Sequence, residues 1–364
     1  MTTTAPRLST TGALRGLVRL VAERITTPLV PADYFDVIDP LRSGAALRGR
    51  IVAINPETRD AVTLVIKPGA GWLGHIPGQY LRIGVDVDGV RQWRTYSLTS
   101  DIERRDGTIA ITVKAIPGGM VSNYLVRRAR VGTVVQLDQA AGSFVLETPS
   151  PAKVLFVTAG SGITPVMGML RALPHGKAAD IVVVHSAPTP EAVIFGGELR
   201  GRAARRQLHL VEVHSGTDGR LDATALGRLV PDLTERHTWA CGPADLLDDL
   251  ESHWAATGIA DRLHTERFRP TVVATGDGGQ ITFSASGTTV ECDGTRSLLD
   301  TGEAAGVLMP SGCRMGICFG CVAPLRRGAV RDLRTGQVTT AAEGDGVVIQ
   351  TCISAAAGPC DINL

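Results

Sequence analysis

The sequence predicts a multidomain chain in which an antiparallel β-barrel, an α/β region with a parallel sheet and a small α+β region follow one another. Residues 46–148 contain β-rich runs separated by Gly, Pro and Asp turns, which is typical of a small antiparallel barrel. Residues 151–265 alternate buried apolar runs with helical patterns, which indicates parallel strands joined by helices. Residues 280–364 combine a predicted hairpin, a predicted helix and a cysteine-rich loop.

Length and composition set the outer limits. The 364 residues are enough for about two to four domains. A formal net charge of +1 argues against a general nucleic-acid-binding protein. Seven cysteines, four of them in one set, do not resemble a secreted disulfide framework. No apolar run has the length of a membrane span and no signal peptide is visible, so we expect a cytoplasmic protein.

Residues 1–45 form an N-terminal extension. Within residues 12–25, apolar side chains recur at helical spacing with arginines between them, which predicts a short amphipathic helix. Two interpretations are open. The helix could lie on the inner face of a membrane or on a membrane-bound partner, or it could pack on the protein's own surface.

The barrel is predicted from runs at 50–54, 61–66, 80–85, 109–113 and 133–137. The same region holds the string Arg94-Thr95-Tyr96-Ser97. Arginine can bind a phosphate, an aromatic ring can stack on a flavin, and a serine hydroxyl can hydrogen-bond near the reactive edge of that ring. Alone, such a string is often only a strand edge.

A second string lies downstream in the barrel region. Gly118 and Gly119 precede a predicted helix start, where we expect Ser122 to be the capping hydroxyl. Backbone N–H groups at a helix start can bind a pyrophosphate. Alone, this pattern is often only a helix cap. The two strings in this order within one barrel favour a flavin site.

The α/β region opens with a buried strand at 153–158, the turn Gly160-Ser161-Gly162-Ile163-Thr164-Pro165 and a helical pattern at 166–173. Strand, glycine turn and helix make a phosphate-binding crossover, although Pro165 takes the place of a third glycine. Further strands are predicted at 181–185 and 208–213. A last strand ends in Cys241-Gly242-Pro243, before a helix at 244–254. Taken alone, Cys241 is more simply a small buried residue.

Residues 266–279 have the composition of a linker, and residues 280–364 then carry cysteines at the spacing C-x4-C-x2-C, with a fourth after 30 intervening residues. These are Cys313, Cys318, Cys321 and Cys352. The spacing is that of a plant-type [2Fe–2S] cluster, whereas zinc sites usually have two separated CxxC pairs. Gly312, Gly316 and Gly320 allow tight turns in such a loop. We interpret Cys292 and Cys360 as structural.

Together, the Arg94–Ser97 string, the Gly160–Pro165 turn and Cys241-Gly242-Pro243 resemble the ferredoxin–NADP⁺ reductase superfamily. The C-terminal region resembles plant-type ferredoxins, which implies a β-grasp fold. The fused order is similar to single-chain reductases such as the phenylacetyl-CoA epoxidase reductase. With residues 39–44, it resembles in particular actinobacterial reductases that serve acyl-CoA desaturases or alkane hydroxylases. The resemblance covers about residues 35–364.

The resemblance implies a role for each motif residue. The flavin would be bound by Arg94, Thr95, Tyr96 and Ser97, and its phosphates by Gly118, Gly119 and Ser122. The nicotinamide nucleotide would be bound by Gly160, Ser161, Gly162, Thr164, Pro165, Gly242 and Pro243. Ser97 and Cys241 would lie nearest the reacting rings, and the four cysteines would hold the cluster. Glu266-Arg267-Phe268 matches the place where relatives approach the flavin.

Many relatives carry an arginine after the second nucleotide strand that binds the 2′-phosphate of NADPH. The matching stretch here, 185–190, has none. Ser186, Arg220 or an arginine between 200 and 206 could take its place, so the sequence slightly favours NADPH over NADH. The resemblance also favours FAD over FMN.

We therefore expect an oxidoreductase in which NAD(P)H reduces FAD, and single electrons pass through the cluster to an external oxygen-activating iron enzyme. The expected partner is an acyl-CoA desaturase in fatty acid desaturation, or an alkane hydroxylase. A ring-hydroxylating oxygenase or an epoxidase is the alternative. A redox-responsive regulatory protein without turnover is an alternative of another class. Five arginines near the cysteine loop in sequence, Arg314, Arg326, Arg327, Arg331 and Arg334, are a hypothetical docking patch for an acidic partner.

Overall fold

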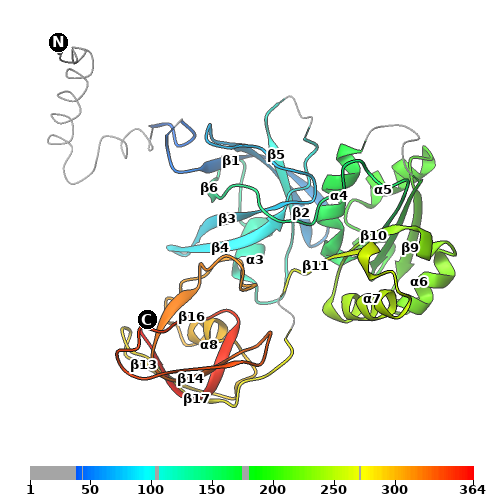
Figure 1. Ribbon diagram of the computed structural model, residues 1–364. Helices are drawn as coiled ribbons and strands as arrows, with labels where there is room; N and C mark the ends of the chain where they lie inside the picture. The colour runs from blue at the N-terminus through cyan, green and yellow to red at the C-terminus, as the bar shows by residue number, and fades with distance from the viewer. Residues whose placement is uncertain (1–37, 43, 103–105, 174–179, 270–271) are drawn as a thin grey trace, which may run out of the picture.

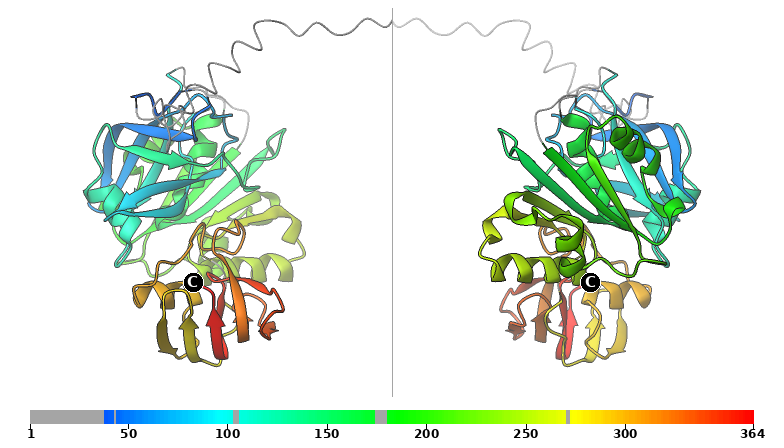
Figure 2. Two further views of the ribbon diagram at one scale, coloured as in Figure 1. Left: turned by 90° about the vertical axis from the view of Figure 1, so that its left-hand side faces the viewer. Right: turned by 90° about the vertical axis from the view of Figure 1, so that its right-hand side faces the viewer.

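The computed structural model describes residues 38–42, 44–102, 106–173, 180–269 and 272–364, which form three sheets, each with its own core (Figure 1). Figure 2 shows that the third sheet lies below the other two and ends at the C-terminus. The amphipathic segment expected at 12–25 lies outside the described residues. Among the described helices, none is long and apolar enough to cross a membrane.

The first sheet is antiparallel and has the order β4-β3-β6-β1-β2-β5. Its elements are β1 (Arg48–Thr58), β2 (Ala61–Pro68), β3 (Tyr80–Val87), β4 (Val90–Ser97), β5 (Ile109–Lys114), α3 (Met120–Arg127) and β6 (Val134–Leu137). A bridge between Leu98 and Ile111 joins the two edge strands. The six strands therefore close around a core of buried Ile, Leu and Val side chains, which confirms the predicted antiparallel barrel.

The second sheet is parallel and has the order β11-β10-β7-β8-β9. Its strands are β7 (Lys153–Ala159), β8 (Asp180–Ala187), β9 (His209–His214), β10 (His237–Cys241) and β11 (Leu263–Glu266). Its helices are α4 (Ile163–Ala172), α5 (Gly196–Ala204), α6 (Ala223–Leu229) and α7 (Ala244–Ala256). Along β7, Phe156 packs into one core with residues of α4 and α5, and Leu155 into the opposite core with residues of α6 and α7. The buried apolar runs thus reflect a sheet covered on both faces.

The third sheet has the order β13-β12-β17-β14-β15, with β16 paired to β14. Its elements are β12 (Gly279–Phe283), β13 (Thr288–Cys292), α8 (Leu298–Ala304), β14 (Val322–Asp332), β15 (Val338–Ala341), β16 (Val348–Gln350) and β17 (Ser354–Ile362). The β12–β13 hairpin is antiparallel and β12 pairs in parallel with β17. Leu298 and Leu299 of α8 pack on the sheet. This is the expected α+β arrangement.

The glycines at the end of the predicted linker lie against this third sheet. Gly278 donates from its N–H to the Ala356 carbonyl at 3.1 Å, and Gly358 donates to the Gly278 carbonyl at 2.8 Å. A Cβ atom at Gly276 would collide with the Ala356 carbonyl. Close packing on β17 therefore accounts for glycine at Gly276, Gly278 and Gly279.

The barrel and the parallel sheet meet through α4. A Cβ at Gly168 of α4 would lie 2.5 Å from the carbonyl oxygen of Leu98, the residue that follows β4. Three residues on, Arg171 donates to the Thr99 carbonyl. The helix that begins at the glycine turn therefore packs directly on the end of the strand that carries Ser97.

Candidate functional site

Three of the predicted cysteine ligands lie in the loop before β14, and Cys352 meets this loop from the turn between β16 and β17. The Sγ atoms of Cys321 and Cys352 are 3.1 Å apart, too far for a disulfide bond. The backbone N–H of Cys313 donates to Cys318 Sγ at 3.1 Å, and that of Gly320 donates to the same sulfur at 3.4 Å. Contact with the Cys352 thiol lowers the pKa of Cys321 to about 6, and the same contact raises the pKa of Cys352. Cysteine thiolates are the form that binds iron, and Cys321 is the partner of this pair that deprotonates first.

The loop around these sulfurs has the tight backbone that a cluster needs. A Cβ at Gly312 would collide with Cys318 Sγ. Gly316 has a φ of +73°, and Arg314 and Phe319 also lie in the left-handed region although they are not glycine. Strained residues of this kind gather at ligand-binding loops. The four cysteines and their glycines fit a [2Fe–2S] cluster.

The cysteine loop packs against the barrel at Arg82 of β3. Figure 1 shows the loop, in orange, turned toward the barrel beside β4. Arg82 Nη1 lies 2.9 Å and 3.0 Å from the positions that Cβ atoms would take at Gly312 and Gly320. On the barrel side, Arg82 pairs with Asp138 and lies over the Trp93 ring, 5.2 Å from its centroid. Burial raises the pKa of Cys318, but N–H donors from Cys313 and Gly320, together with Arg82, outweigh it and lower the pKa.

The string predicted for flavin runs along β4 beside this contact. Burial lowers the pKa of Arg94 to about 10, and the cation of Arg314, from the cysteine loop, acts in the same direction. Burial raises the pKa of Tyr96. The hydroxyls of Thr95 and Ser97 are buried and have no hydrogen-bond partner within the described part of the chain. Unpaired buried hydroxyls are costly, so their orphaned state fits a polar ligand that is bound here.

The second flavin string forms a turn into α3. Gly118 has a φ of +70° and Gly119 is the N-cap residue. The expectation that Ser122 caps the helix is wrong, because its hydroxyl donates to the Gly119 carbonyl at 3.3 Å and accepts from the Ile116 N–H at 3.3 Å. Ser122 closes the turn, and the backbone N–H groups at the helix start are left to face an anion.

The nucleotide turn is the short 3₁₀ segment Gly160–Gly162, and α4 starts at Ile163, three residues earlier than predicted. Pro165 sits in the first turn of α4, where its missing N–H costs nothing. Thr164 donates its hydroxyl to the Ser161 carbonyl at 2.9 Å. A Cβ at Gly162 would collide with the carbonyl oxygen of Cys241. The turn and Cys241-Gly242 are therefore in contact at the carboxyl ends of β7 and β10, as predicted.

Two residues that sequence reasoning missed or weighted lightly complete this region. Glu266 is the register partner of Cys241 in the β10–β11 pair. Burial raises its pKa to about 8, and its Oε2 has no hydrogen-bond partner among the residues that the structure describes. Burial also raises the pKa of Cys241, with Glu266 acting in the same direction. The pKa of Tyr80 is raised by burial and then by Cys313 and Glu266, which places Tyr80 between the cysteine loop and the strand ends.

The residues considered for the 2′-phosphate lie near the ends of β8 and β9. Ser186 is the second-last residue of strand β8 and is largely buried. Arg200 is held by Glu212, with its Nε 2.8 Å from Oε1. Arg220 is ion-paired with Asp245. Arg200 and Arg220 thus already have carboxylate partners, whereas Ser186 remains a candidate for the 2′-phosphate.

The five arginines of the hypothetical docking patch are largely neutralised. Arg314 pairs with Asp300 and Glu303, Arg326 with Glu343. Arg331 and Arg334 pair with Asp277 and Asp332, and Arg327 lies 3.9 Å from Asp361. These pairs weaken the argument for a basic surface, because each cation has a carboxylate beside it.

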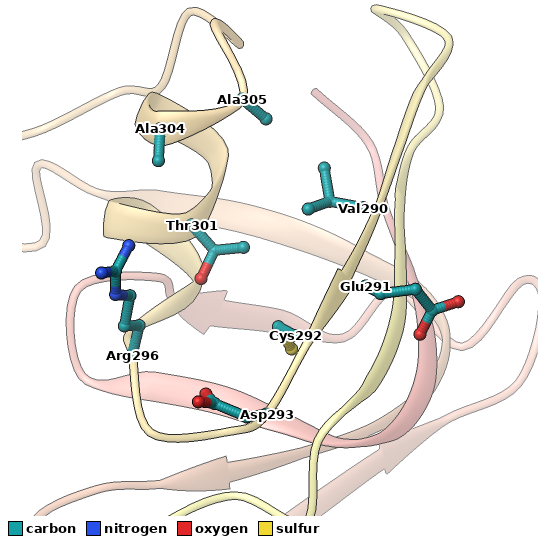
Figure 3. A pocket seen from close by; sticks show the side chains of 8 residues that line it. All are labelled: Val290, Glu291, Cys292, Asp293, Arg296, Thr301, Ala304 and Ala305. Carbon is teal, nitrogen blue, oxygen red and sulfur yellow. The ribbon is translucent and has the colours of Figure 1, made fainter.

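The third sheet also has a hollow of about 540 Å³ beside α8, lined in part by Cys292, Asp293, Arg296 and Thr301. Figure 3 shows these side chains between β13 and α8. None of the predicted flavin, nucleotide or cluster residues lines it. It is therefore separate from the candidate site.

Comparisons with known proteins agree with this arrangement. Residues 51–146 match the oxidoreductase FAD-binding domain, residues 156–252 the oxidoreductase NAD-binding domain, and residues 281–357 the 2Fe-2S iron-sulfur cluster binding domain. An NADPH oxidoreductase of Mycobacterium tuberculosis is 48% identical, over 95% of this chain and 92% of its own length.

Two further proteins are similar to most of this chain. The ferredoxin reductase component of a 3-ketosteroid-9-alpha-monooxygenase from M. tuberculosis is 31% identical over 77% of this chain and 85% of its own length. The solved structure of a phthalate dioxygenase reductase shares the fold, with a TM-score of 0.61, 24% identity, and coverage of 87% of this chain and 97% of that one. The chain thus belongs to the NAD(P)H oxidoreductases that join an FAD-binding, an NAD-binding and a 2Fe-2S ferredoxin-type domain.

Proposed function

We propose that this protein is the reductase component of an oxygenase-type system. Electrons would enter from NADPH, pass through FAD and a [2Fe–2S] cluster, and leave to an external oxygen-activating iron enzyme. The observation that carries the proposal is the contact between the cysteine loop and the barrel at Arg82. The cysteine loop lies against Arg82 of β3, and β3 pairs directly with β4, the strand that carries the flavin string.

The bound groups supply the redox chemistry: a flavin takes two electrons from a reduced nicotinamide and releases them singly to an iron–sulfur centre. The chain supplies the positions. Arg94 and the N–H groups after Gly118 and Gly119 would bind the flavin phosphates, and Tyr96 would stack on the ring. Thr95 and Ser97 would hydrogen-bond to the flavin, and Ser122 would close the phosphate turn.

On the nucleotide side, the turn of Gly160, Ser161 and Gly162 with the start of α4 at Thr164 and Pro165 would bind the pyrophosphate. Cys241, Gly242 and Pro243 would border the nicotinamide. Glu266, protonated at neutral pH because burial raises its pKa to about 8, would add an uncharged carboxyl there. Cys313, Cys318, Cys321 and Cys352 would ligate the cluster. We also propose that residues 46–148, 151–265 and 280–364 are the three domains, and that residues 266–279 link the second domain to the third.

NADPH is the proposed donor. Support comes from Ser186 at the end of β8 and from the name of the 48% identical relative. The measurement is kcat/KM for NADPH and NADH. The Ser186→Asp variant places a carboxylate where the 2′-phosphate would lie, so its preference should shift toward NADH. An unchanged ratio would contradict the assignment of Ser186.

For the acceptor, we propose an acyl-CoA desaturase or an alkane hydroxylase, on the resemblance of the N-terminal extension. Several relatives are instead named as reductase components of monooxygenases or demethylases, which supports the alternative of another oxygenase. Turnover with a purified membrane desaturase, compared with a ring-hydroxylating oxygenase, separates the two.

The route itself is tested with the full-length holoprotein and two cysteine variants. NADPH should bleach the flavin of the wild type, generate the electron paramagnetic resonance signal of a reduced cluster, and support steady reduction of cytochrome c. Cys318→Ser should keep flavin bleaching and lose the cluster signal and most cytochrome c reduction. Cys292→Ser, outside the ligand loop, is the matched control and should behave as wild type. Flavin bleaching without turnover in the wild type would favour a regulatory protein instead.

A further inference from the structure

Two histidines and a glutamate gather on the parallel sheet, away from the predicted nucleotide and cluster residues. His237 is the first residue of β10, and His264 lies on β11 directly opposite Trp239. His237 and Trp239 are two residues apart and so face the same side of the sheet. Glu147 comes from the segment between the barrel and β7. Cys241, at the other end of β10, is about 13 Å further along the strand.

The three side chains are held in place by Trp239. Its ring is fully buried and stacks on His264, with centroids 4.5 Å apart and an interplanar angle of 15°. His237 also lies nearly parallel to it, at 6.5 Å. The Trp239 Nε1–H donates to the Val145 carbonyl at 3.0 Å, which fixes the segment that carries Glu147 beside the two strands.

The spacing of the three groups is that of metal ligands rather than of hydrogen bonds. Glu147 Oε1 lies 3.5 Å from His264 Nε2 and 3.9 Å from His237 Nδ1, beyond the usual reach of a hydrogen bond. All three ligand atoms lie within 4.8 Å of one another. Around a tetrahedral Zn²⁺ with bonds of about 2.0–2.2 Å, ligand atoms are about 3.3–3.6 Å apart.

The two ring nitrogens also lack any other partner. His237 Nδ1 and His264 Nε2 are both buried from solvent and accept or donate no hydrogen bond among the described residues. Buried polar atoms of this kind normally have a partner, in the protein or in a bound group. A single cation between the rings and the carboxylate would satisfy all three at once.

From this geometry we propose that Glu147, His237 and His264 bind a divalent transition-metal ion, with Zn²⁺ as the fitting case. Two imidazoles and one carboxylate are a common zinc donor set, and a water would complete the tetrahedron. The ion would join the segment after the barrel to both β10 and β11. Because its ligands come from three segments, the ion would stabilise this junction. Zn²⁺ has no redox chemistry, so it would take no part in electron transfer.

The test uses the full-length holoprotein after chelator treatment and dialysis, with its iron and sulfide content confirmed to be intact. Zn²⁺ is titrated in competition with a chromophoric chelator, and one equivalent should bind. His264→Gln and Glu147→Gln should each weaken binding by more than about tenfold, since even changes in the shell behind the ligands have effects of that order. His209→Gln, on an exposed residue of β9, is the control and should bind as wild type.

X-ray absorption at the zinc edge identifies the ligands directly. The expected shell contains only nitrogen and oxygen, with the signature of two imidazoles. A sulfur shell at about 2.3 Å would place the zinc in the cysteine loop and overturn the proposal. So would equal loss of binding in the His209 variant, or no binding by the wild type. Zinc should also raise the thermal midpoint of the wild type and leave that of Glu147→Gln unchanged, a comparison that does not depend on His264→Gln folding well.

Discussion

Replacing Arg82 with glutamine should lower the midpoint potential of the iron–sulfur centre. Reduction adds one negative charge to the cluster, and the Arg82 guanidinium at the cysteine loop stabilises that charge. A charge-assisted hydrogen bond contributes about 1.5–3 kcal/mol. The added electron is spread over the cluster, so we take it to strengthen the Arg82 hydrogen bond by roughly 1 kcal/mol. A tenfold change in a one-electron equilibrium is about 59 mV, so the midpoint potential should shift by about 40 mV.

Asp138 makes the sign of this effect testable. It pairs with Arg82 and partly offsets the cation, so Asp138→Asn should raise the potential while Arg82→Gln lowers it. Arg91→Gln is the matched control, since Arg91 on the neighbouring strand pairs with Asp86, with its Nη2 2.7 Å from Oδ2. Redox titrations followed by electron paramagnetic resonance give each value. Shifts of the same sign in the Arg82 and Asp138 variants, or one in the Arg91 variant as large as in Arg82→Gln, would refute the reasoning.

Three further predictions concern single residues. Glu266 has a pKa raised to about 8, so its contribution to stability is present below its unfolded pKa and is lost as the pH rises through about 8. Between pH 4.5 and about 8, the thermal midpoint of the wild type should therefore fall relative to that of Glu266→Gln. A constant difference between the two midpoints over these pH values would contradict the prediction. Gly162→Ala should cost about 1–3 kcal/mol of unfolding free energy, because its Cβ collides with backbone at Cys241; denaturant unfolding measures this, and Gly197→Ala, where the space is open, is the control. Arg236 lowers the pKa of Asp232 to about 2, so that stabilisation is lost as the pH falls from about 4 toward 2, and acid unfolding of Arg236→Met should show a smaller loss over that range.

The parts of the site that were predictable are those with a local signal. The cysteine spacing, the strand–turn–helix at Gly160 and the hairpin before α8 are each contained in a few dozen residues, and each is found in the structure as predicted. Arg82 had no such signal. Its contact with Gly312 joins residues more than two hundred positions apart, and nothing in the pattern of β3 distinguishes it from any other strand arginine.

Local composition has two limits in this chain. Glycines between two domains are typical of a linker, and a serine near a helix start is typical of a cap. In the structure, contact with a distant strand explains the glycines, and hydrogen bonds within the local turn explain the serine. The glycines allow close approach to β17, and the Ser122 hydroxyl binds the turn that precedes the helix.

The close contact between α4 and the carbonyl of Leu98 constrains how such reductases can change. Because the helix and the strand end touch through backbone at Gly168, this contact sets the spacing between the predicted nucleotide turn and the predicted flavin string. Substitutions that remodel the outer surface of the third sheet leave that spacing untouched. Such a protein could thus adapt to a new electron acceptor through changes in the third sheet, without changes at the flavin and nucleotide sites.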